Sequence, residues 1–206
     1  KAPKDAYYEK QGNEIVINPS EYGFQILQSD MDARLEAAAE GATVTLYDRA
    51  IFPSVTTGYL QTHLFSDTVS SYIVGAGSSW SQLNNQGIAA AAINGTVLMP
   101  GEVFSFNDVV GDTTADKGFV EDYAYESGRL ITQVGGGVCR VASTLYAAVL
   151  NSSLEVVMRY NHSSPVGYLP LPEDILRRNG DYKLRRTLRG VIPAQGMYRR
   201  VLRADL

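Results

Sequence analysis

The stretch VGGGVCRVASTLYAAVL, residues 134–150, joins a glycine run to a segment with helical periodicity. Apolar residues recur at positions 138, 141, 142, 145, 148 and 149, so one face of the predicted helix packs inward. Cys139, the only cysteine among the 206 residues, falls in the first turn of this helix. The free N–H groups and partial positive charge of a helix N-terminus stabilise a thiolate, so we expect a reactive thiol here. An inert core cysteine is the alternative, because unpaired cysteines are among the most buried residues.

The residues around the cysteine supply candidate binding groups. Glycine readily adopts positive φ angles, so the run can point backbone N–H groups at the oxyanion of a reacting carbonyl. The donors are expected around Gly137 to Cys139, at the start of the helix. The full set of candidate oxyanion and substrate-binding residues is Gly135, Gly136, Gly137, Val138, Ser143 and Asn161.

His162 is the predicted general base. Apolar residues alternate along residues 154–160, and His162 continues the same face of this predicted strand. A helix rises ~1.5 Å per residue and a strand ~3.3 Å, so an antiparallel helix–strand pair brings Cys139 and His162 to one end. Papain-like and transglutaminase-like enzymes use such a pair with a third polar group, for which Asp174 is the first candidate and Asn161 the second. The alternatives are a buried, hydrogen-bonded His162 and a surface carboxylate at Asp174.

The sequence predicts neither a metal site nor a cofactor. One cysteine and two histidines, His63 and His162, show no ligand pair at the spacings usual for zinc. A closed site would need carboxylates from scattered positions, and we expect His63 to be structural.

Charge is distributed unevenly along the chain. Residues 173–206 hold nine of the 18 Lys and Arg residues and four acidic residues, which gives this end a net charge of +5 and the preceding residues −9. The acidic body argues against nucleic acid as a partner, whereas the basic end suits an anionic polymer. A solvated strand face is the alternative, because apolar and charged residues nearly alternate over residues 182–189.

Hydropathy predicts no membrane span. No apolar run approaches the roughly 18 residues that a spanning helix requires, and residues 1–4 show no signal-peptide pattern. The sequence leaves open whether a longer parent chain carries a membrane anchor or a signal peptide. With one cysteine there is no internal disulfide, so both a secreted and a cytosolic protein remain compatible with the composition.

Two domains of an α+β fold are predicted, residues 1–58 and 59–206. The first is a ββαβ module suited to docking or binding, with strands at 14–17 and 24–27, a helix over 30–40 capped by Ser29 or Asp30, and a strand at 43–47. The second is a mixed α/β domain with a strand at 68–74, a glycine-rich loop at 75–79, a structural helix at 80–93 and a half-buried strand through Phe104 and Phe106. We expect the cysteine helix to pack on an antiparallel sheet.

The same residues resemble the VanW family, named from vancomycin-resistance gene clusters of Gram-positive bacteria. The resemblance covers roughly residues 65–175 and rests on these segments: ING at 93–95, PGEVFSFN at 100–107, VVG at 109–111, GGGVC at 135–139, STLY at 143–146 and NHS at 161–163. Residues 5–60 resemble the peptidoglycan-binding module that often precedes a VanW domain. The family usually has Gln and Ser where this chain has Arg140 and Ala142, and Gly-Arg-Asp-Ala-Thr-Val near Asp174.

This resemblance implies work in the bacterial cell envelope, outside the cell or in the wall, with peptidoglycan or its precursors as partner. Two hypotheses remain open. In the first, the chain is a thiol hydrolase or acyl transferase that acts on amide bonds of peptidoglycan peptides, with Cys139 as nucleophile, His162 as base and acid, and Asp174 or Asn161 orienting the histidine. In the second, it is a non-catalytic envelope module whose N-terminal unit or a cleft binds wall polymer. Exposure of the Cys139 sulfur and its distance from His162 would separate the two.

Overall fold

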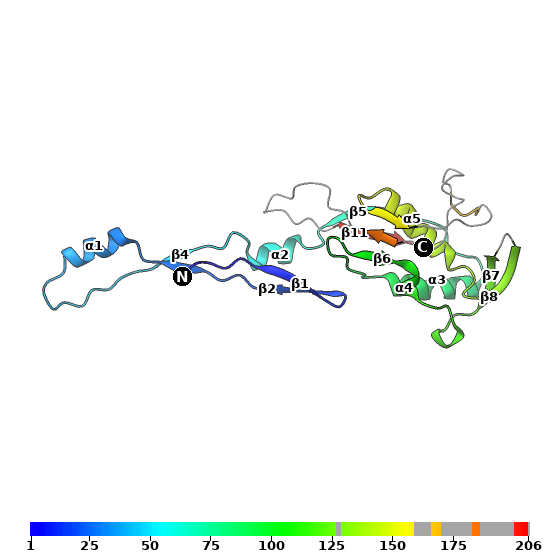
Figure 1. The fold of residues 1–206 in the computed structure, drawn as a ribbon, viewed down its shortest axis with the longest axis horizontal. Coiled ribbons are helices and arrows are strands. Elements are labelled where there is room, and N and C mark those ends of the chain that lie inside the picture. Colours follow the sequence, from blue (N-terminus) through cyan, green and yellow to red (C-terminus); the bar gives the residue numbers. More distant parts are fainter. Residues whose placement is uncertain (127–128, 159–165, 170–182, 186–199, 206) are drawn as a thin grey trace. The chain divides into compact units, whose positions relative to one another are not determined.

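The computed structural model describes residues 1–126, 129–158, 166–169, 183–185 and 200–205, and these fall into two units (Figure 1). The first unit is formed by residues 1–66 and the second by the described residues from 67 onward. The fold is mixed α/β, with five α-helices and several small sheets among the described residues. This confirms the predicted fold class.

The first unit begins with a β-hairpin. Strands β1 (Tyr7–Gln11) and β2 (Glu14–Asn18) pair antiparallel, with Tyr7 opposite Asn18 and Gln11 opposite Glu14. The two-residue turn contains Gly12 at φ 62°, a left-handed conformation that favours glycine and suits the twist of a tight hairpin. The prediction of a strand at 14–17 is confirmed. Strand β1 was not predicted, although the Gly-Asn turn is a recognised hairpin signal.

A second antiparallel pair in this unit consists of β3 (Gly23–Gln25) and β4 (Arg49–Ile51). The chain between them contains helix α1 (Gln28–Glu36), which has no buried residue. The predicted helix over 30–40 is therefore present but shifted, and Ser29 and Asp30 lie inside it rather than capping it. The predicted strand at 43–47 is wrong: these residues are irregular, and no strand within residues 1–66 pairs with them.

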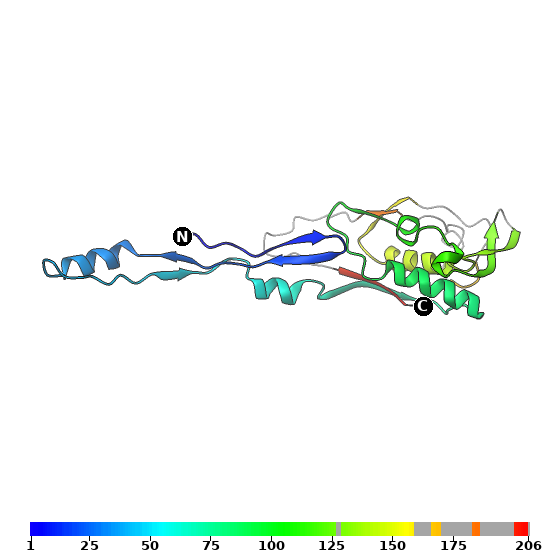
Figure 2. The ribbon, with the colours of Figure 1, turned by 90° about the horizontal axis from the view of Figure 1, so that it is seen from below.

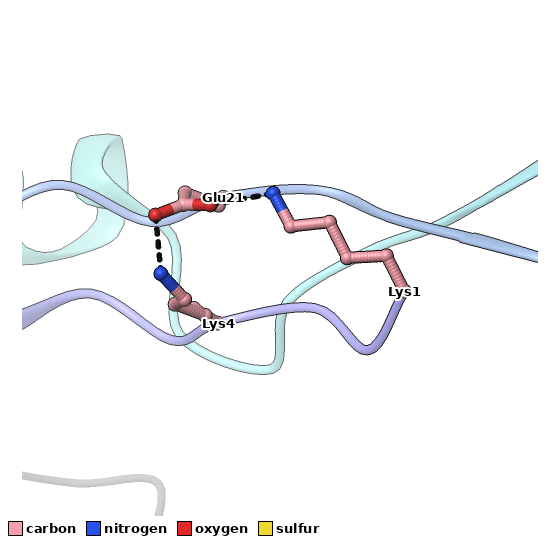
Figure 3. Close-up of polar contacts among 3 residues, drawn as sticks. All are labelled: Lys1, Lys4 and Glu21. Carbon is pink, nitrogen blue, oxygen red and sulfur yellow. Dashed lines mark hydrogen bonds and ion pairs between the residues drawn. The ribbon is translucent and has the colours of Figure 1, made fainter.

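Glu21 binds two lysines beside an isolated β-bridge between Lys4 and Glu21 (Figure 3). One carboxylate oxygen lies 2.7 Å from the Lys1 ammonium and the other 2.7 Å from the Lys4 ammonium. Hydrogen bonds from Lys1 and then Lys4 lower the pKa of Glu21 from an ordinary 4.5 to about 2. All three side chains are exposed, so solvent screens the pairs and they add little to stability.

Helix α2 (Thr57–His63) ends the first unit. The Thr56 hydroxyl caps it by accepting from the Tyr59 N–H at 3.1 Å, and Leu60 is buried. The His63 ring stacks on Tyr59 with ring centroids 4.1 Å apart, and His63 Nδ1 lies 2.9 Å from the Tyr59 carbonyl oxygen. These contacts suit the structural role expected for His63.

The second unit alternates short strands and helices. In chain order its elements are β5 (Asp67–Ile73), α3 (Trp80–Ile93), β6 (Val103–Ser105), α4 (Phe106–Val110), the 3-10 helix η1 (Ala115–Lys117), β7 (Glu121–Glu126), β8 (Arg129–Val134), α5 (Cys139–Leu150), β9 (Glu155–Met158), β10 (Lys183–Arg185) and β11 (Arg200–Asp205). The strand predicted at 68–74 and the helix predicted at 80–93 are confirmed. The strand predicted through Phe104 and Phe106 stops at Ser105, because the Ser105 hydroxyl accepts from the Asp108 N–H and caps α4.

Three small sheets surround the helices of this unit. Strand β10 pairs antiparallel with both β6 and β9, β7 and β8 form an antiparallel hairpin, and β5 pairs with β11 in parallel. Strand β10 lies within the alternating segment 182–189, so a strand was expected there, but its position between β6 and β9 was not.

Helix α5 forms the centre of the hydrophobic core. Its residues 141–149 are all buried, including the predicted inward positions. Phe104 of β6 belongs to the same core cluster, and Val156 of β9 packs against it. The strands that α5 contacts most are β5 and β11, which pair in parallel rather than antiparallel. The helix also contacts α3, β5 and β11, and Figure 2 shows α3 and α5 close together.

Candidate functional site

Cys139 is the first residue of α5 and is exposed to solvent. The preceding residues 135–138 form turns, and Val138 is already in the right-handed helical conformation. The rest of the helix from Val141 to Val149 is buried. The geometry therefore presents the thiol-bearing residue at the end of an otherwise buried helix, which is the position that the sequence predicted.

The backbone N–H groups near Cys139 divide into occupied and available donors. Those of Gly135, Gly136 and Val138 donate to the carbonyls of Val120, Gln133 and Gly135 at 3.0, 3.2 and 3.3 Å. Those of Arg140 and Val141 donate to the carbonyls of Gly137 and Val138 at 3.1 and 3.0 Å. The N–H group of Gly137 has no hydrogen-bond partner among the described residues, and that of Cys139 bonds to its own sulfur. Neither group is bonded to a carbonyl of the described residues, so both are candidate donors to an incoming anion.

The surroundings of Cys139 raise the pKa of its thiol above the ordinary value of 9.0. Desolvation by the neighbouring protein atoms is the larger effect, and a hydrogen bond from the residue's own backbone N–H only partly offsets it. This differs from the expectation that the helix N-terminus makes the thiolate stable. The physical reason is that desolvation of the thiol outweighs the hydrogen bond from the Cys139 N–H.

The glycine run is required by close packing. Gly135 has φ +85°, and a Cβ there would overlap the Thr113 side chain. A Cβ on Gly136 would overlap the backbone carbonyl group of Asp122. Two of the three glycines thus let the loop pass directly against neighbouring segments before α5 begins.

Two buried amides of α3 hold this loop in place. Asn85, with 0% of its surface exposed, donates to the carbonyl oxygens of Val120 and Gly136 and accepts from the Val120 N–H, each at 2.9 Å. Gln86, 2% exposed, accepts from the Gly77 N–H at 3.0 Å and donates to the Gly137 carbonyl oxygen at 3.4 Å. Buried amides with all these partners are rigid, so they fix the path of the chain into Cys139. Sequence reasoning treated α3 as structural only and missed this role, although the polar run SQLNNQ at 81–86 was visible.

Asp122 of β7 lies at the N-terminal end of α3. Its carboxylate accepts hydrogen bonds from Ser79, Ser81, Gln82 and the Tyr123 N–H. These bonds, led by the one from Ser81, outweigh desolvation and lower the pKa of Asp122 from an ordinary 3.8 to about 2. Asp122 is therefore an anion at neutral pH, and its partners place it in a structural network that ties β7 to α3.

Arg140 and Ser143 lie one and four residues after Cys139 on α5. Arg140 Nη1 donates to the carbonyl oxygens of Gly75 at 2.6 Å and Ala76 at 3.1 Å. The Arg140 guanidinium carbon lies 4.5 Å from the ring centroid of Tyr168. The buried Ser143 hydroxyl donates to the Cys139 carbonyl oxygen at 2.8 Å and lies 3.2 Å from the Tyr168 hydroxyl. The structure thus brings Cys139, Arg140, Ser143 and Tyr168 together.

The remaining predicted site residues are His162, Asp174 and Asn161, and all three lie outside the described residues. Their roles and the papain-like arrangement therefore stay predictions. Strand β9, which leads toward His162, is present at 155–158 within the predicted strand. Among the described residues, no three His, Cys, Asp or Glu side chains gather in a way that could hold a metal ion.

The described helices include none with the length and apolar character needed to cross a membrane.

Comparison with known proteins identifies relatives along most of the chain. The family described as VanW like protein matches residues 81–196. An uncharacterized protein, YoaR, of Bacillus subtilis (strain 168) is 33% identical over 162 residues, which cover 77% of this chain and 53% of that protein. The vancomycin B-type resistance protein VanW of Enterococcus faecalis (strain ATCC 700802 / V583) is 32% identical over 78 residues, 38% of this chain and 28% of that protein. The matches thus span about half the length of YoaR and about a quarter of the length of the E. faecalis protein. No solved structure gives a significant match.

Proposed function

The chain belongs to the VanW-like protein family, and from this premise we propose that it acts in the bacterial cell envelope as a cysteine-dependent hydrolase or acyl transferase on peptidoglycan peptides. The E. faecalis relative is named for vancomycin resistance, which supports a role near cell-wall precursors. The observation that carries the proposal is Cys139 at the start of α5, an exposed residue beside the N–H groups of Gly137 and Cys139, neither of which is bonded to a carbonyl of the described residues.

In the first half of the proposed reaction, the Cys139 sulfur attacks the carbonyl carbon of a peptide amide. A carbon–sulfur bond forms, the carbonyl oxygen becomes an oxyanion, and the N–H groups of Gly137 and Cys139 are the donors for it. The carbon–nitrogen bond then breaks, and the amine leaves with the proton that the thiol has given up. The product is a thioester on Cys139.

In the second half, water or the amine of another peptide attacks the thioester carbonyl. Water gives a carboxylic acid, and an amine gives a new amide. The carbon–sulfur bond breaks and the sulfur regains a proton, so the enzyme returns to its starting state. The choice between hydrolysis and transfer depends on which nucleophile reaches the thioester.

The raised pKa of the Cys139 thiol adds a requirement to this mechanism. A thiol with a pKa above its ordinary value is protonated at neutral pH, so the reaction needs a base that removes the proton. We assign this role to His162, with Asp174 or Asn161 orienting its ring, on the basis of the predicted strand geometry.

Defined muropeptides test the proposal. Wild-type protein, Cys139→Ala and the control Asn84→Ala are incubated with single muropeptides, and the products are identified by mass spectrometry. We expect a cleaved or transferred product with wild type and with Asn84→Ala, because the Asn84 amide bonds, among the described residues, to Asn85 at 3.4 Å and to the Gly118 carbonyl oxygen at 2.8 Å. Cys139→Ala should give none. Absence of any Cys139-dependent product from wild type would contradict the enzyme hypothesis.

Thiol labelling tests the need for a base. Iodoacetamide labels Cys139 in native and in urea-unfolded protein at pH 7, and the two rates are compared for wild type and His162→Ala. If His162 deprotonates the thiol, native wild type reacts faster than unfolded protein, and His162→Ala reacts more slowly because desolvation alone then governs the pKa. Equal or slower labelling of native wild type would instead favour the alternative, a binding module in which the Asn85 and Gln86 network has a structural role only.

A further inference from the structure

The Arg140 side chain, which follows Cys139 in α5, is held by contacts with its neighbours and can bind a ligand. Its Nη1 atom makes both of its hydrogen bonds among the described residues, to the carbonyl oxygens of Gly75 and Ala76. Its guanidinium carbon lies over the Tyr168 ring, 4.5 Å from the ring centroid. Nη1 and the ring together hold the group in one orientation.

Tyr168 couples this orientation to the thiol residue. The Tyr168 hydroxyl lies 3.2 Å from the Ser143 hydroxyl, which in turn donates to the Cys139 carbonyl oxygen at 2.8 Å. Arg140, Tyr168, Ser143 and Cys139 are therefore linked through direct contacts. A ligand bound by the guanidinium would be held at a fixed position relative to the first turn of α5.

Part of the Arg140 guanidinium is unbonded within the described part of the chain. Guanidinium carries five N–H groups in its plane, and stacking on a ring covers a face but not the edge. The bonds to Gly75 and Ala76 use Nη1 only, so Nε and Nη2 have no partner among the described residues. The ion pairs in the described part of the chain are those of Glu21 with Lys1 and Lys4. Asp122, a buried acid of the same unit, is already bound by neutral donors.

We propose that Arg140 binds the C-terminal carboxylate of the peptide on which Cys139 acts. A planar guanidinium with a free edge matches a carboxylate through two parallel, charge-assisted hydrogen bonds. Arg140 follows Cys139 in the first turn of α5, and the proposal puts that carboxylate next to the bond under attack, so that the peptide bond before the C-terminal residue is the one cleaved. This inference rests on the proposed function for the identity of the bond, while carboxylate binding itself does not depend on turnover.

Binding measurements in a Cys139→Ala background test the inference without turnover. The probes are a synthetic pentapeptide stem ending in D-Ala-D-Ala, as the free acid and as the C-terminal carboxamide. A third probe replaces the stem Glu with Gln and keeps the free C-terminus, because a side-chain carboxylate is a second source of the same chemistry. Isothermal titration calorimetry gives Kd for each probe.

We expect the free acid to bind roughly 10- to 100-fold more tightly than the carboxamide, which is the range for losing hydrogen bonds between charged groups. The Glu-to-Gln probe should bind like the parent acid. Arg140→Gln should abolish the preference for the free acid, and Arg140→Lys should keep part of it because a point charge remains.

Arg34→Gln is the matched control variant. Its guanidinium carbon lies 4.7 Å from the Tyr47 ring centroid, and it donates to the Thr45 carbonyl oxygen, so it shares the stacked setting of Arg140 in the other unit. We expect this variant to bind the probes like the parent. Thermal melting of each variant confirms that it is folded at the titration temperature.

The outcomes separate this inference from the proposed function. Equal binding of acid and carboxamide, or no binding of either probe at about 10 mM, overturns carboxylate recognition by Arg140. A preference for the free acid that survives Arg140→Gln overturns it as well. If binding is lost with the Glu-to-Gln probe, the side-chain carboxylate of the stem Glu is the group recognised, and the C-terminal assignment is overturned. If the preference depends on Arg140 but wild type forms no product from muropeptides, the binding role stands and the enzyme proposal fails.

Discussion

Replacing Asn85 by alanine should loosen the loop that leads into Cys139. The wild-type amide makes three hydrogen bonds at 2.9 Å, to the N–H and carbonyl of Val120 and to the carbonyl of Gly136, and none of its surface is exposed. Alanine removes all three bonds and takes these partners from the Val120 N–H and the Gly136 carbonyl, whereas the Val120 carbonyl keeps the bond from the Gly135 N–H. At about 1 kcal/mol or more for each bond or stranded group, the free energy of unfolding should fall by roughly 3 kcal/mol.

The neighbouring Asn84 provides the control for this prediction. Its amide donates to the Gly118 carbonyl oxygen at 2.8 Å in an exposed setting, so Asn84→Ala should cost about 1 kcal/mol or less. Urea titration followed by circular dichroism measures both, and the melting temperature of Asn85→Ala should fall by about 10 °C. If Asn85→Ala costs no more than Asn84→Ala, the amide does not hold the loop and the reasoning is refuted.

Two further substitutions test the same network. Gly136→Ala should lower the free energy of unfolding by about 3 kcal/mol, because its Cβ would overlap the Asp122 carbonyl group. Gly87→Ala, in open space on α3, should raise it by about 0.5–1 kcal/mol, and equal effects in urea titration would contradict the packing argument. The lowered pKa of Asp122, about 2 against an ordinary 3.8, predicts stability that is present above pH 4 and lost as pH falls toward 2. Asp122→Asn should weaken this acid dependence in a pH series of urea titrations, and an unchanged dependence would exclude Asp122 as its source.

Local sequence patterns predicted several elements with useful accuracy. The helix expected at 80–93 is α3, and the strand expected at 68–74 is β5 with a one-residue shift. Helical spacing predicted one inward face for α5, since residues three and four apart lie on the same side of a helix, but residues 141–149 are buried on every side. Prediction failed at 43–47, where a β-branched run indicates a strand but no partner strand within residues 1–66 is present.

The site shows the same division between local and distant information. The location of Cys139 at the start of a helix followed from the glycine run and the helical periodicity after it. The direction in which the pKa of the Cys139 thiol shifts did not follow from the sequence. It depends on which protein atoms surround the sulfur and which N–H groups are already bonded. Arg140 was noticed only as a departure from the usual family residue, and its contacts with Gly75 and Tyr168 were not foreseen.

The amino-acid sequence by itself determined the family, the fold class and the position of Cys139 at the start of a helix, because neighbouring residues encode periodicity and turns. Only the tertiary structure decided that Asn85 binds Gly136, 51 residues away, and that Arg140 binds Gly75, 65 residues away. It also decided that β10 pairs between β6 and β9. Such partners depend on how distant segments pack, and no local spacing specifies which donor will meet which acceptor.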